Sequence, residues 1–285
     1  MILITGADGA VGSYAEEVFA GERLHLGTLE TLDVTDPDKV LTLCRELRPA
    51  AVVHLASETD VDRCEKERAH AFRVNADGAA NVAAACRETG AVMAYVSTGM
   101  VFDGSKDEPY VESDPVAPGN VYAESKLAGE EAVRRELERF FIVRTSWLIG
   151  GGKRDKKFVA KILRLLGERD RIEVVSDLYG TLTYGRQLLL QIKALLATEH
   201  YGVFHAANPG KVSRFDIAQE IVRLIGSSAE VVPVGAERFP LPAPRGKSEV
   251  LSVAKLEALG LCRMTDWRRA LAEYLEELKR IGRWE

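Results

Sequence analysis

Tyr122 and Lys126, in the run Tyr-Ala-Glu-Ser-Lys, are the residues whose types and spacing best suit chemistry. A separation of four residues places the phenol and the ammonium on one face of a helix. The tyrosine could give a proton to a ketone oxygen while a nicotinamide delivers hydride to the carbon. The lysine would lower the pKa of the phenol and hold the nicotinamide ribose. By spacing alone, a solvated helix face fits the pair as well.

A hydroxyl is needed to orient the carbonyl, and Ser97-Thr98 ends a predicted strand just upstream. Thr98 is therefore the third candidate catalytic residue. Ser97 is not expected to be a nucleophile, because no G-x-S-x-G elbow surrounds it.

A glycine-rich turn, Gly6-Ala-Asp-Gly9-Ala-Val-Gly12, lies between a predicted strand and a predicted helix. One glycine permits the tight turn, another admits the pyrophosphate, and a third allows close helix packing. The alternative is an ordinary glycine-rich turn, but its place after a strand and before a helix favours a dinucleotide site. No acid or arginine at the end of the second strand separates NADH from NADPH. Asp33 is better placed for the adenine amino group.

Short β-branched runs alternate with helical patterns in the first half of the chain. The expected strands are Ile2–Ile4, Arg23–Leu26, Ala51–Leu55, Val92–Ser97 and Phe141–Thr145. The expected helices are Val11–Ala20, Pro37–Arg48, Cys64–Phe72, Ala76–Glu88 and Tyr122–Phe140. This alternation predicts an α/β fold with a doubly wound parallel sheet of the Rossmann type.

The second half predicts a smaller C-terminal substrate lobe. Its expected helices are Lys156–Leu166, Tyr184–Thr198, Ser213–Leu224 and Trp267–Arg280, with an ordered proline-rich loop over Pro233–Gly246. We expect residues 1–150 to form the dinucleotide-binding domain, with a returning segment near 181–205. Residues 151–285 would form mainly the substrate lobe.

Composition narrows the partners. The net charge of −5 does not favour nucleic acid or an anionic membrane, and no apolar run is long enough to span a bilayer. The four cysteines are scattered without CxxC spacing, so no metal site is expected. With no visible signal peptide, these features predict a cytoplasmic protein.

The chain resembles the extended short-chain dehydrogenases, and within them the dTDP-4-dehydrorhamnose reductase family, nearly from end to end. The motifs that carry the resemblance are the Gly6–Gly12 turn, Leu32–Asp36, His54–Ala56, Val74-Asn75, Ser97-Thr98, Val101–Gly104, Asn120–Glu130, Arg144–Trp147, Tyr179–Thr181, Gly202–His205 and the Arg245 loop. The family implies NAD(P)H-dependent reduction of a 4-keto group in a nucleotide-activated deoxysugar.

The resemblance also implies residue roles. Thr98, Tyr122 and Lys126 would be catalytic. The cofactor would meet Gly6, Gly9, Ala10, Val11, Gly12, Asp33, Val34, Ala56, Ser57, Thr59, Tyr122 and Lys126. The substrate would meet Val61, Thr98, Met100, Trp147 and Arg245.

Three residues depart from the family pattern. Gly99-Met100 stands where the reductases usually carry Asp-Tyr, and Glu58 stands where an aromatic residue or histidine is usual. We expect these changes to affect the sugar pocket rather than hydride transfer. Arg144, His54 and His205 are expected to be core residues, and Glu130–Arg139 a solvated helix face or part of a homodimer contact.

Two other functions remain open at this level. The fold and cofactor site also occur in the regulatory subunit of methionine adenosyltransferase, which does not catalyse a reduction. A nucleotide-sugar epimerase, which recycles its cofactor, is the second alternative.

Overall fold

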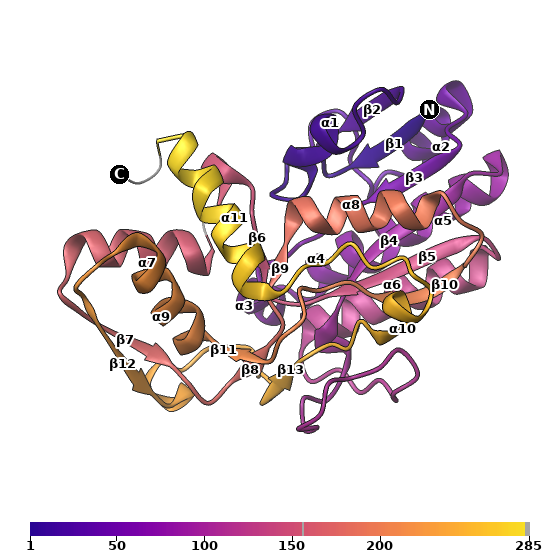
Figure 1. Ribbon diagram of the computed structural model, residues 1–285. Coiled ribbons are helices and arrows are strands. Elements are labelled where there is room, and N and C mark those ends of the chain that lie inside the picture. The colour runs from indigo at the N-terminus through magenta and orange to yellow at the C-terminus, as the bar shows by residue number, and fades with distance from the viewer. Residues whose placement is uncertain (156, 283–285) are drawn as a thin grey trace.

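The predicted β-branched runs form one six-stranded parallel sheet. The computed structural model describes residues 1–155 and 157–282 (Figure 1). The strand order is β10-β5-β4-β3-β1-β2. The strands are β1 (Ile2–Thr5), β2 (Leu24–Gly27), β3 (Ala51–His54), β4 (Val92–Thr98), β5 (Phe140–Thr145) and β10 (Gly202–His205). The expected doubly wound parallel sheet is therefore confirmed.

Alternate strand residues build a core on each face of the sheet. Leu3 and Val52 pack with the helices of one face, whereas Ile4 and Val53 pack with those of the other. The first face is covered by α2 (Pro37–Leu47), α5 (Gly78–Thr89) and α6 (Val121–Glu136). The second is covered by α1 (Ala15–Val18) and α8 (Gly185–Leu196). Burial on both faces explains the continuous apolar runs of these strands.

The chain leaves the sheet after β5 and returns to it through α8. Strand β10 then pairs in parallel with β5, from Gly202 opposite Phe141 to His205 opposite Arg144. The short helix α10 (Ala254–Ala258) also packs near β10.

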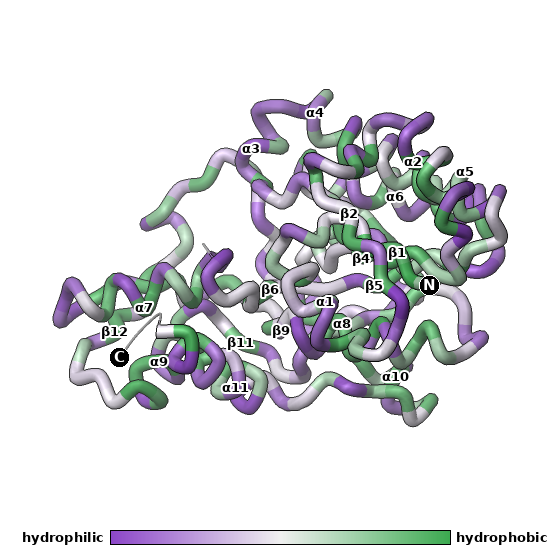
Figure 2. Tube along the Cα trace, turned by 90° about the horizontal axis from the view of Figure 1, so that it is seen from above, coloured by the Kyte–Doolittle hydropathy of each residue, from purple (hydrophilic) through white to green (hydrophobic). Residues whose placement is uncertain are grey.

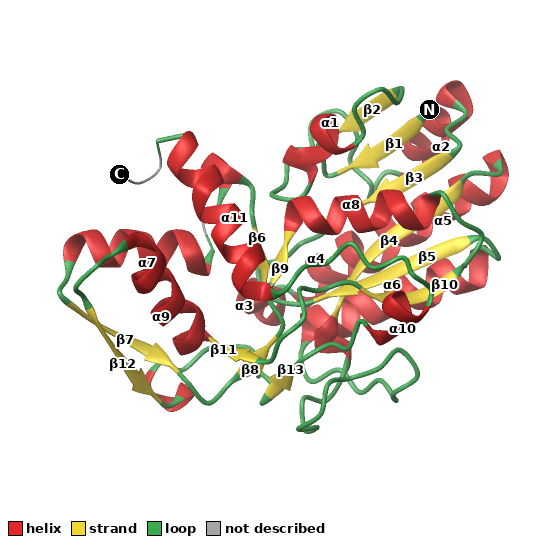
Figure 3. Cartoon of the chain, in the orientation of Figure 1, coloured by secondary structure: helices red, strands yellow, loops and turns green. Residues whose placement is uncertain are grey.

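The smaller lobe contains short sheets and three longer helices (Figure 3). Its strands are β7 (Arg171–Val175), β8 (Tyr179–Gly180), β11 (Val212–Ser213), β12 (Glu230–Val234) and β13 (Ser248–Glu249). Its helices are α7 (Phe158–Glu168), α9 (Arg214–Ile225) and α11 (Trp267–Arg280). Strands β6 (Leu148–Ile149) and β9 (Thr183–Tyr184) pair where the two lobes meet. Ser213 caps the N-terminus of α9, and its side chain forms a capping box with Asp216.

Several element boundaries differ from the expectations. The helix expected at Val11–Ala20 is a 3₁₀ turn, Gly12–Tyr14, followed by the single turn of α1. The helix expected at Cys64–Phe72 is divided into α3 (Val61–Lys66) and α4 (Arg68–Phe72). A π-helical turn, Arg73–Asp77, then leads into α5.

Tertiary pairing explains two further differences. Helix α6 ends at Glu136 rather than Phe140, because Leu137 is extended and the chain enters β5 at Phe140. Pro233 lies in β12 rather than in the expected loop. Strand β12 pairs only with β7 in the described sheets, and an edge strand tolerates the missing N–H of proline. Lys156, the expected start of a helix, lies outside the described residues.

Hydropathy follows this architecture. The sheet region is mostly hydrophobic, while α3 and α4 are largely hydrophilic (Figure 2). Within the described ranges, no helix has the length and apolar character that crossing a bilayer requires.

Candidate active site

The three glycines after β1 have different surroundings. Gly6 has a φ of +64°, and a Cβ atom there would lie 2.7 Å from the backbone nitrogen of Ala56. A Cβ atom at Gly12 would lie 2.6 Å from the Cα atom of Ala7. At Gly9, the only neighbour within 4 Å would be the Gly6 oxygen, at 3.1 Å. Gly6 and Gly12 are thus enclosed by backbone, whereas an added carbon at Gly9 would meet only one carbonyl oxygen, in a tight contact.

This turn fits the pyrophosphate of a dinucleotide. The open side of Gly9 is a cradle that a larger residue would narrow. Among the described residues, the backbone N–H groups of Ala10 and Val11 donate to no protein acceptor. The helix that follows has a single turn, so its dipole is small. These two N–H groups would therefore supply most of the attraction for the phosphates.

Asp33 and Val34 follow β2 and lie beside α5. The Asp33 carboxylate accepts hydrogen bonds from the backbone and hydroxyl of Thr35, at 2.9 and 2.8 Å, which hold its pKa below the usual range. Val34 is buried, and a Cβ atom at Gly78 would lie 2.8 Å from its methyl group. The pair is therefore fixed in place at the end of the sheet.

The loop after β3 is held by Asn75, which lies in the π-helical turn. The Asn75 side-chain oxygen accepts from the Ser57 hydroxyl at 2.8 Å and the Glu58 backbone N–H at 2.9 Å. Its amide nitrogen donates to the Glu58 carbonyl and to the Ser125 hydroxyl, at 3.1 and 3.0 Å. Asn75 thus connects the loop carrying Ala56, Ser57 and Thr59 to α6. Val74-Asn75 is one of the motifs that carry the family resemblance, but no pattern in the sequence indicates this role of Asn75.

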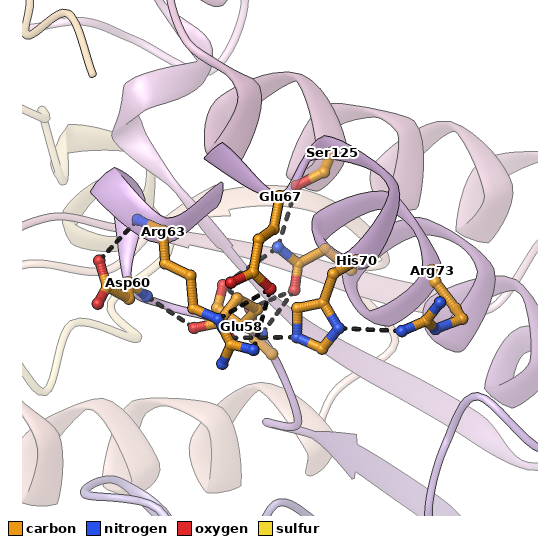
Figure 4. Close-up of polar contacts among 9 residues, drawn as sticks. Glu58, Asp60, Arg63, Glu67, His70, Arg73 and Ser125 are labelled. Carbon is orange, nitrogen blue, oxygen red and sulfur yellow. Dashed lines mark hydrogen bonds and ion pairs between the residues drawn. The ribbon is translucent and has the colours of Figure 1, made fainter. Parts of the chain in front are cut away.

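Glu58 is oriented toward α3 and α4 (Figure 4). Its carboxylate lies 3.0 Å from Arg63 and 3.3 Å from His70 and accepts from the Asp60 backbone N–H. The expectation that this departure changes the sugar pocket is not supported, because the side chain is bonded within the α3–α4 segment. Its observed contacts stabilise the N-terminal end of α3.

Thr98 and Tyr122 meet at the carboxyl end of β4. Burial raises the pKa of Tyr122, and the neighbouring Thr98 side chain lowers it by a smaller amount. Lys126 is buried one turn farther along α6, with its Nζ atom 4.2 Å from the centre of the Tyr95 ring. Burial lowers the pKa of Lys126 to about 7, while Glu130 opposes that effect. The three expected catalytic residues lie in this one region.

The expected lowering of the Tyr122 pKa by Lys126 is not found in this state. The phenol is desolvated, and the negative charge of Glu249 raises its pKa further. Desolvation destabilises the phenolate, and this effect outweighs the lowering of the pKa by the Thr98 side chain. A phenol that keeps its proton is suited to act as an acid.

A buried carboxylate anchors α6 to the sheet. Glu130 accepts from Ser97 at 2.6 Å and forms two bonds to Arg144, at 2.9 and 2.7 Å. Arg134 adds a bond of 3.1 Å from the surface. The expectation that Glu130 belongs to a solvated face is wrong, because its side chain is fully buried. Arg144 is a core residue, as expected.

The two histidines are also core residues, as expected. The Nδ1 atom of His54 lies 2.7 Å from the Thr5 hydroxyl, and that of His205 lies 3.1 Å from the Tyr110 carbonyl. Burial lowers the pKa of each imidazole to about 3. Both rings are therefore neutral at ordinary pH.

A cavity of about 140 Å³, partly open to solvent, lies beside this region. Met100 and Arg245 line it, as do Asn120 and Glu249. Asn120 caps α6 by accepting from Ala123 at 2.9 Å and donates to the Pro244 carbonyl at 3.0 Å. Asn120 therefore connects the N-terminus of α6 to the loop that carries Arg245.

Arg245 and Trp147 have defined partners around this cavity. Arg245 lies 3.0 Å from the carboxylate of Asp62, next to Val61 at the start of α3. The Trp147 ring has the Arg214 guanidinium 4.0 Å from its centre. Arg214, Asn120 and Glu249 were not singled out as site residues from the sequence. Only Asn120 carried a signal, as the N-terminal cap of the helix.

The chain matches a known protein family over nearly its whole length. The sequence model of the RmlD substrate binding domain matches residues 1–280. The chain belongs to this family. A Mycobacterium tuberculosis protein named dTDP-4-dehydrorhamnose reductase is 39% identical over 285 residues, covering 96% of this chain and 92% of its own.

Two solved structures place this RmlD-family chain in the same group. A dTDP-4-dehydrorhamnose reductase from Clostridium acetobutylicum is 35% identical, with a TM-score of 0.94 and coverage of 98% of this chain and 99% of its own. The Bacillus anthracis reductase, solved with NADP, is 36% identical, with a TM-score of 0.91 and coverage of 97% and 98%. The resemblance to the extended short-chain dehydrogenases is confirmed, and with it the oxidoreductase class.

Proposed function

We propose that this protein uses NAD(P)H to reduce the 4-keto group of a nucleotide-activated deoxysugar, as its relatives' names indicate for them. The placement of the Thr98 side chain beside Tyr122, one helical turn from buried Lys126, carries this proposal. The nearby cavity gives a keto sugar access to the same region.

The reduced nicotinamide supplies hydride to the carbonyl carbon when bound. Tyr122 then donates its phenolic proton to the carbonyl oxygen, and the Thr98 hydroxyl orients that oxygen. The raised pKa of Tyr122 keeps the proton available until negative charge develops on the substrate. Lys126 would hold the nicotinamide ribose and favour reprotonation of the phenol.

The cofactor would lie across the carboxyl ends of β1, β2 and β3. Gly9, Ala10 and Val11 would receive the pyrophosphate, with Gly6 and Gly12 shaping the turn. Asp33 and Val34 would meet adenine, and Ala56, Ser57 and Thr59 would line the cleft together with Tyr122 and Lys126. We propose residues 1–150, with the returning segment near 181–205, as the cofactor domain. Residues 151–285 would be mainly the substrate lobe.

The substrate would lie between the two lobes. Met100 and Arg245 line the cavity, which supports their proposed contact with the nucleotide sugar. Arg245 would exchange its contact with Asp62 for the diphosphate. Val61 and Trp147 would flank the sugar, and Thr98 would face its carbonyl.

A turnover assay with a matched variant tests the function. The protein is incubated with NADH or NADPH and a panel of nucleotide-linked 4-ketosugars, while absorbance of the reduced nicotinamide is followed. Tyr122→Phe should lower kcat by about 10²–10⁴-fold and leave the cofactor Kd unchanged. Tyr201→Phe is the control and should leave kcat unchanged. Within the described part of the chain, the Tyr201 hydroxyl makes no hydrogen bond.

The assay also separates the alternatives. Tight cofactor binding without consumption of any 4-ketosugar would support a regulatory subunit. Sugar conversion without net NAD(P)H consumption would support an epimerase. Full activity in Tyr122→Phe would contradict the proposed proton donor.

The expected homodimer and cytoplasmic location remain predictions. The three buried cysteines, Cys44, Cys64 and Cys86, and the partly buried Cys262 are all free thiols, which is compatible with a reducing compartment. Light scattering of the purified protein measures its oligomeric state.

A further inference from the structure

Two carboxylates line the same cavity, and their hydrogen bonding differs sharply. Asp103 accepts from the Tyr110 hydroxyl at 2.6 Å and from the Ser105 backbone and hydroxyl at 3.0 and 2.8 Å. These donors lower its pKa to about 2. Asp103 therefore has strong partners within the protein.

Glu249, on β13, has much weaker partners. The Ser146 hydroxyl donates to it across 3.4 Å, and the nearby Trp147 side chain lowers its pKa slightly. In the described ranges no lysine or arginine lies within 4.0 Å of its carboxylate. Burial accordingly raises its pKa. A desolvated carboxylate without a strong donor is costly unless a ligand supplies one.

The two nearby arginines are directed elsewhere. Arg245 is bonded to Asp62 and to the Ala243 carbonyl, at 3.0 and 2.8 Å. Arg214 lies over the Trp147 and Phe158 rings, at 4.0 and 4.8 Å. Their charges stabilise the Glu249 carboxylate through space without occupying its acceptor positions. The carboxylate is held in place by these charges and still lines the cavity.

The position of Glu249 relative to Tyr122 limits what it can bind. Glu249 lines the same cavity as Met100 and Asn120, which lie two residues from Thr98 and Tyr122 in the sequence, so the carboxylate and the proposed proton donor belong to one region. Its negative charge also raises the pKa of Tyr122. A diphosphate would be repelled by a carboxylate, whereas a sugar hydroxyl is a good donor to one. The hydroxyl nearest a 4-keto carbon is the one on the adjacent carbon, C3.

We infer that Glu249 accepts a hydrogen bond from the C3 hydroxyl of the keto sugar and makes the enzyme selective for sugars that retain this hydroxyl. The inference rests on the proposed function and names a specificity-determining residue within it. A site that desolvates a carboxylate should discriminate strongly against an analogue lacking the hydroxyl, because the carboxylate would then be left without its donor.

The experiment compares kcat/KM for dTDP-4-keto-6-deoxyglucose with the values for its 3-deoxy and 2-deoxy analogues. For the unmodified protein, removal of the C3 hydroxyl should cost about 10- to 100-fold, as expected for a hydrogen bond to a charged group. Removal of the C2 hydroxyl should cost much less. Glu249→Ala should reduce the 3-deoxy discrimination to within about threefold, and Glu249→Gln should reduce it partly.

Asp103→Asn is the matched control. It changes an acid of the same cavity whose oxygens already have protein donors, so the 3-deoxy discrimination should stay as in the unmodified protein. A second readout follows from the charge near Tyr122. Glu249→Gln should move the alkaline limb of the kcat profile to lower pH, because it removes an effect that raises the Tyr122 pKa.

The outcomes separate the two proposals. If the unmodified protein consumes NAD(P)H with none of these sugars, the proposed function fails. If it turns them over but Glu249→Ala and Glu249→Gln keep the full 3-deoxy discrimination, the inference about Glu249 is overturned. Thermal melting of each variant shows whether it is folded, and the ratio of two substrates on one protein sample does not depend on the folded fraction.

Discussion

Individual glycines of the glycine-rich turn have different roles, some in packing and one in the proposed cofactor binding. Gly9 and Gly12 belong to one motif, yet a side chain at each would meet different neighbours. At Gly12 the obstacle is the backbone of Ala7, which cannot move without disturbing the turn. At Gly9 an added carbon would meet only the Gly6 carbonyl oxygen, at 3.1 Å, and a shift of a few tenths of an ångström relieves that contact. The motif therefore combines a packing requirement with a binding requirement.

We expect Gly9→Ala to melt within about 2 °C of the unmodified protein but to bind NADPH at least tenfold more weakly. Gly12→Ala should lower the free energy of unfolding by about 1–3 kcal/mol, because overpacking against backbone strains the turn. Calorimetric titration and urea unfolding measure the two effects. Equal loss of stability in both variants would contradict this division of roles.

Among the elements, α6 carries the proposed catalytic pair and is anchored through Glu130. The Glu130 carboxylate joins the helix to Ser97 on β4 and Arg144 on β5. A buried ion pair of this kind stabilises little by comparison with apolar packing, but the loss of one partner leaves the other charge uncompensated. The anchor thus fixes the register of α6 on the sheet.

Glu130→Gln should lower the free energy of unfolding by about 3–5 kcal/mol, because Arg144 would remain buried without a counter-charge. Arg134→Ala removes only the exposed partner of the same carboxylate and should cost less than about 1 kcal/mol. Urea unfolding of the two variants gives the comparison. Similar losses for both would show that the buried pair has no special weight.

The elements also show what a sequence can and cannot predict. The strands of the parallel sheet and α11 follow from local patterns, because β-branched runs and a strong amphipathic period are local signals. The end of α6 at Glu136 depends on pairing of Phe140 with Met93, which lies far away in the sequence. Glu249 had no motif at all, and only tertiary packing brings it to the cavity.

At the scale of the whole molecule, α11 is hydrogen-bonded to the segment that follows the glycine-rich turn. The Glu277 carboxylate accepts from Tyr14, at 2.9 Å, and from Tyr184, at 2.5 Å. The Tyr14 hydroxyl also accepts from the Gly151 backbone N–H at 2.8 Å. The C-terminal helix is therefore bonded directly to both lobes.

Glu277→Leu should lower the free energy of unfolding by about 2–4 kcal/mol, because two enclosed tyrosine hydroxyls would lose their acceptor. Glu276→Leu changes the exposed neighbour and should alter stability by less than about 1 kcal/mol. Chemical denaturation measures both. A loss confined to Glu276→Leu would contradict the role of the tyrosine–carboxylate network.

The return of the chain through β10 has a consequence for synthesis on the ribosome. Strand β5 has β4 on one side and β10 on the other, and β10 begins only at Gly202. Until that segment emerges, the growing sheet has an open apolar edge at β5. Nascent chains that stall between about residues 150 and 200 are therefore the forms that most need a chaperone.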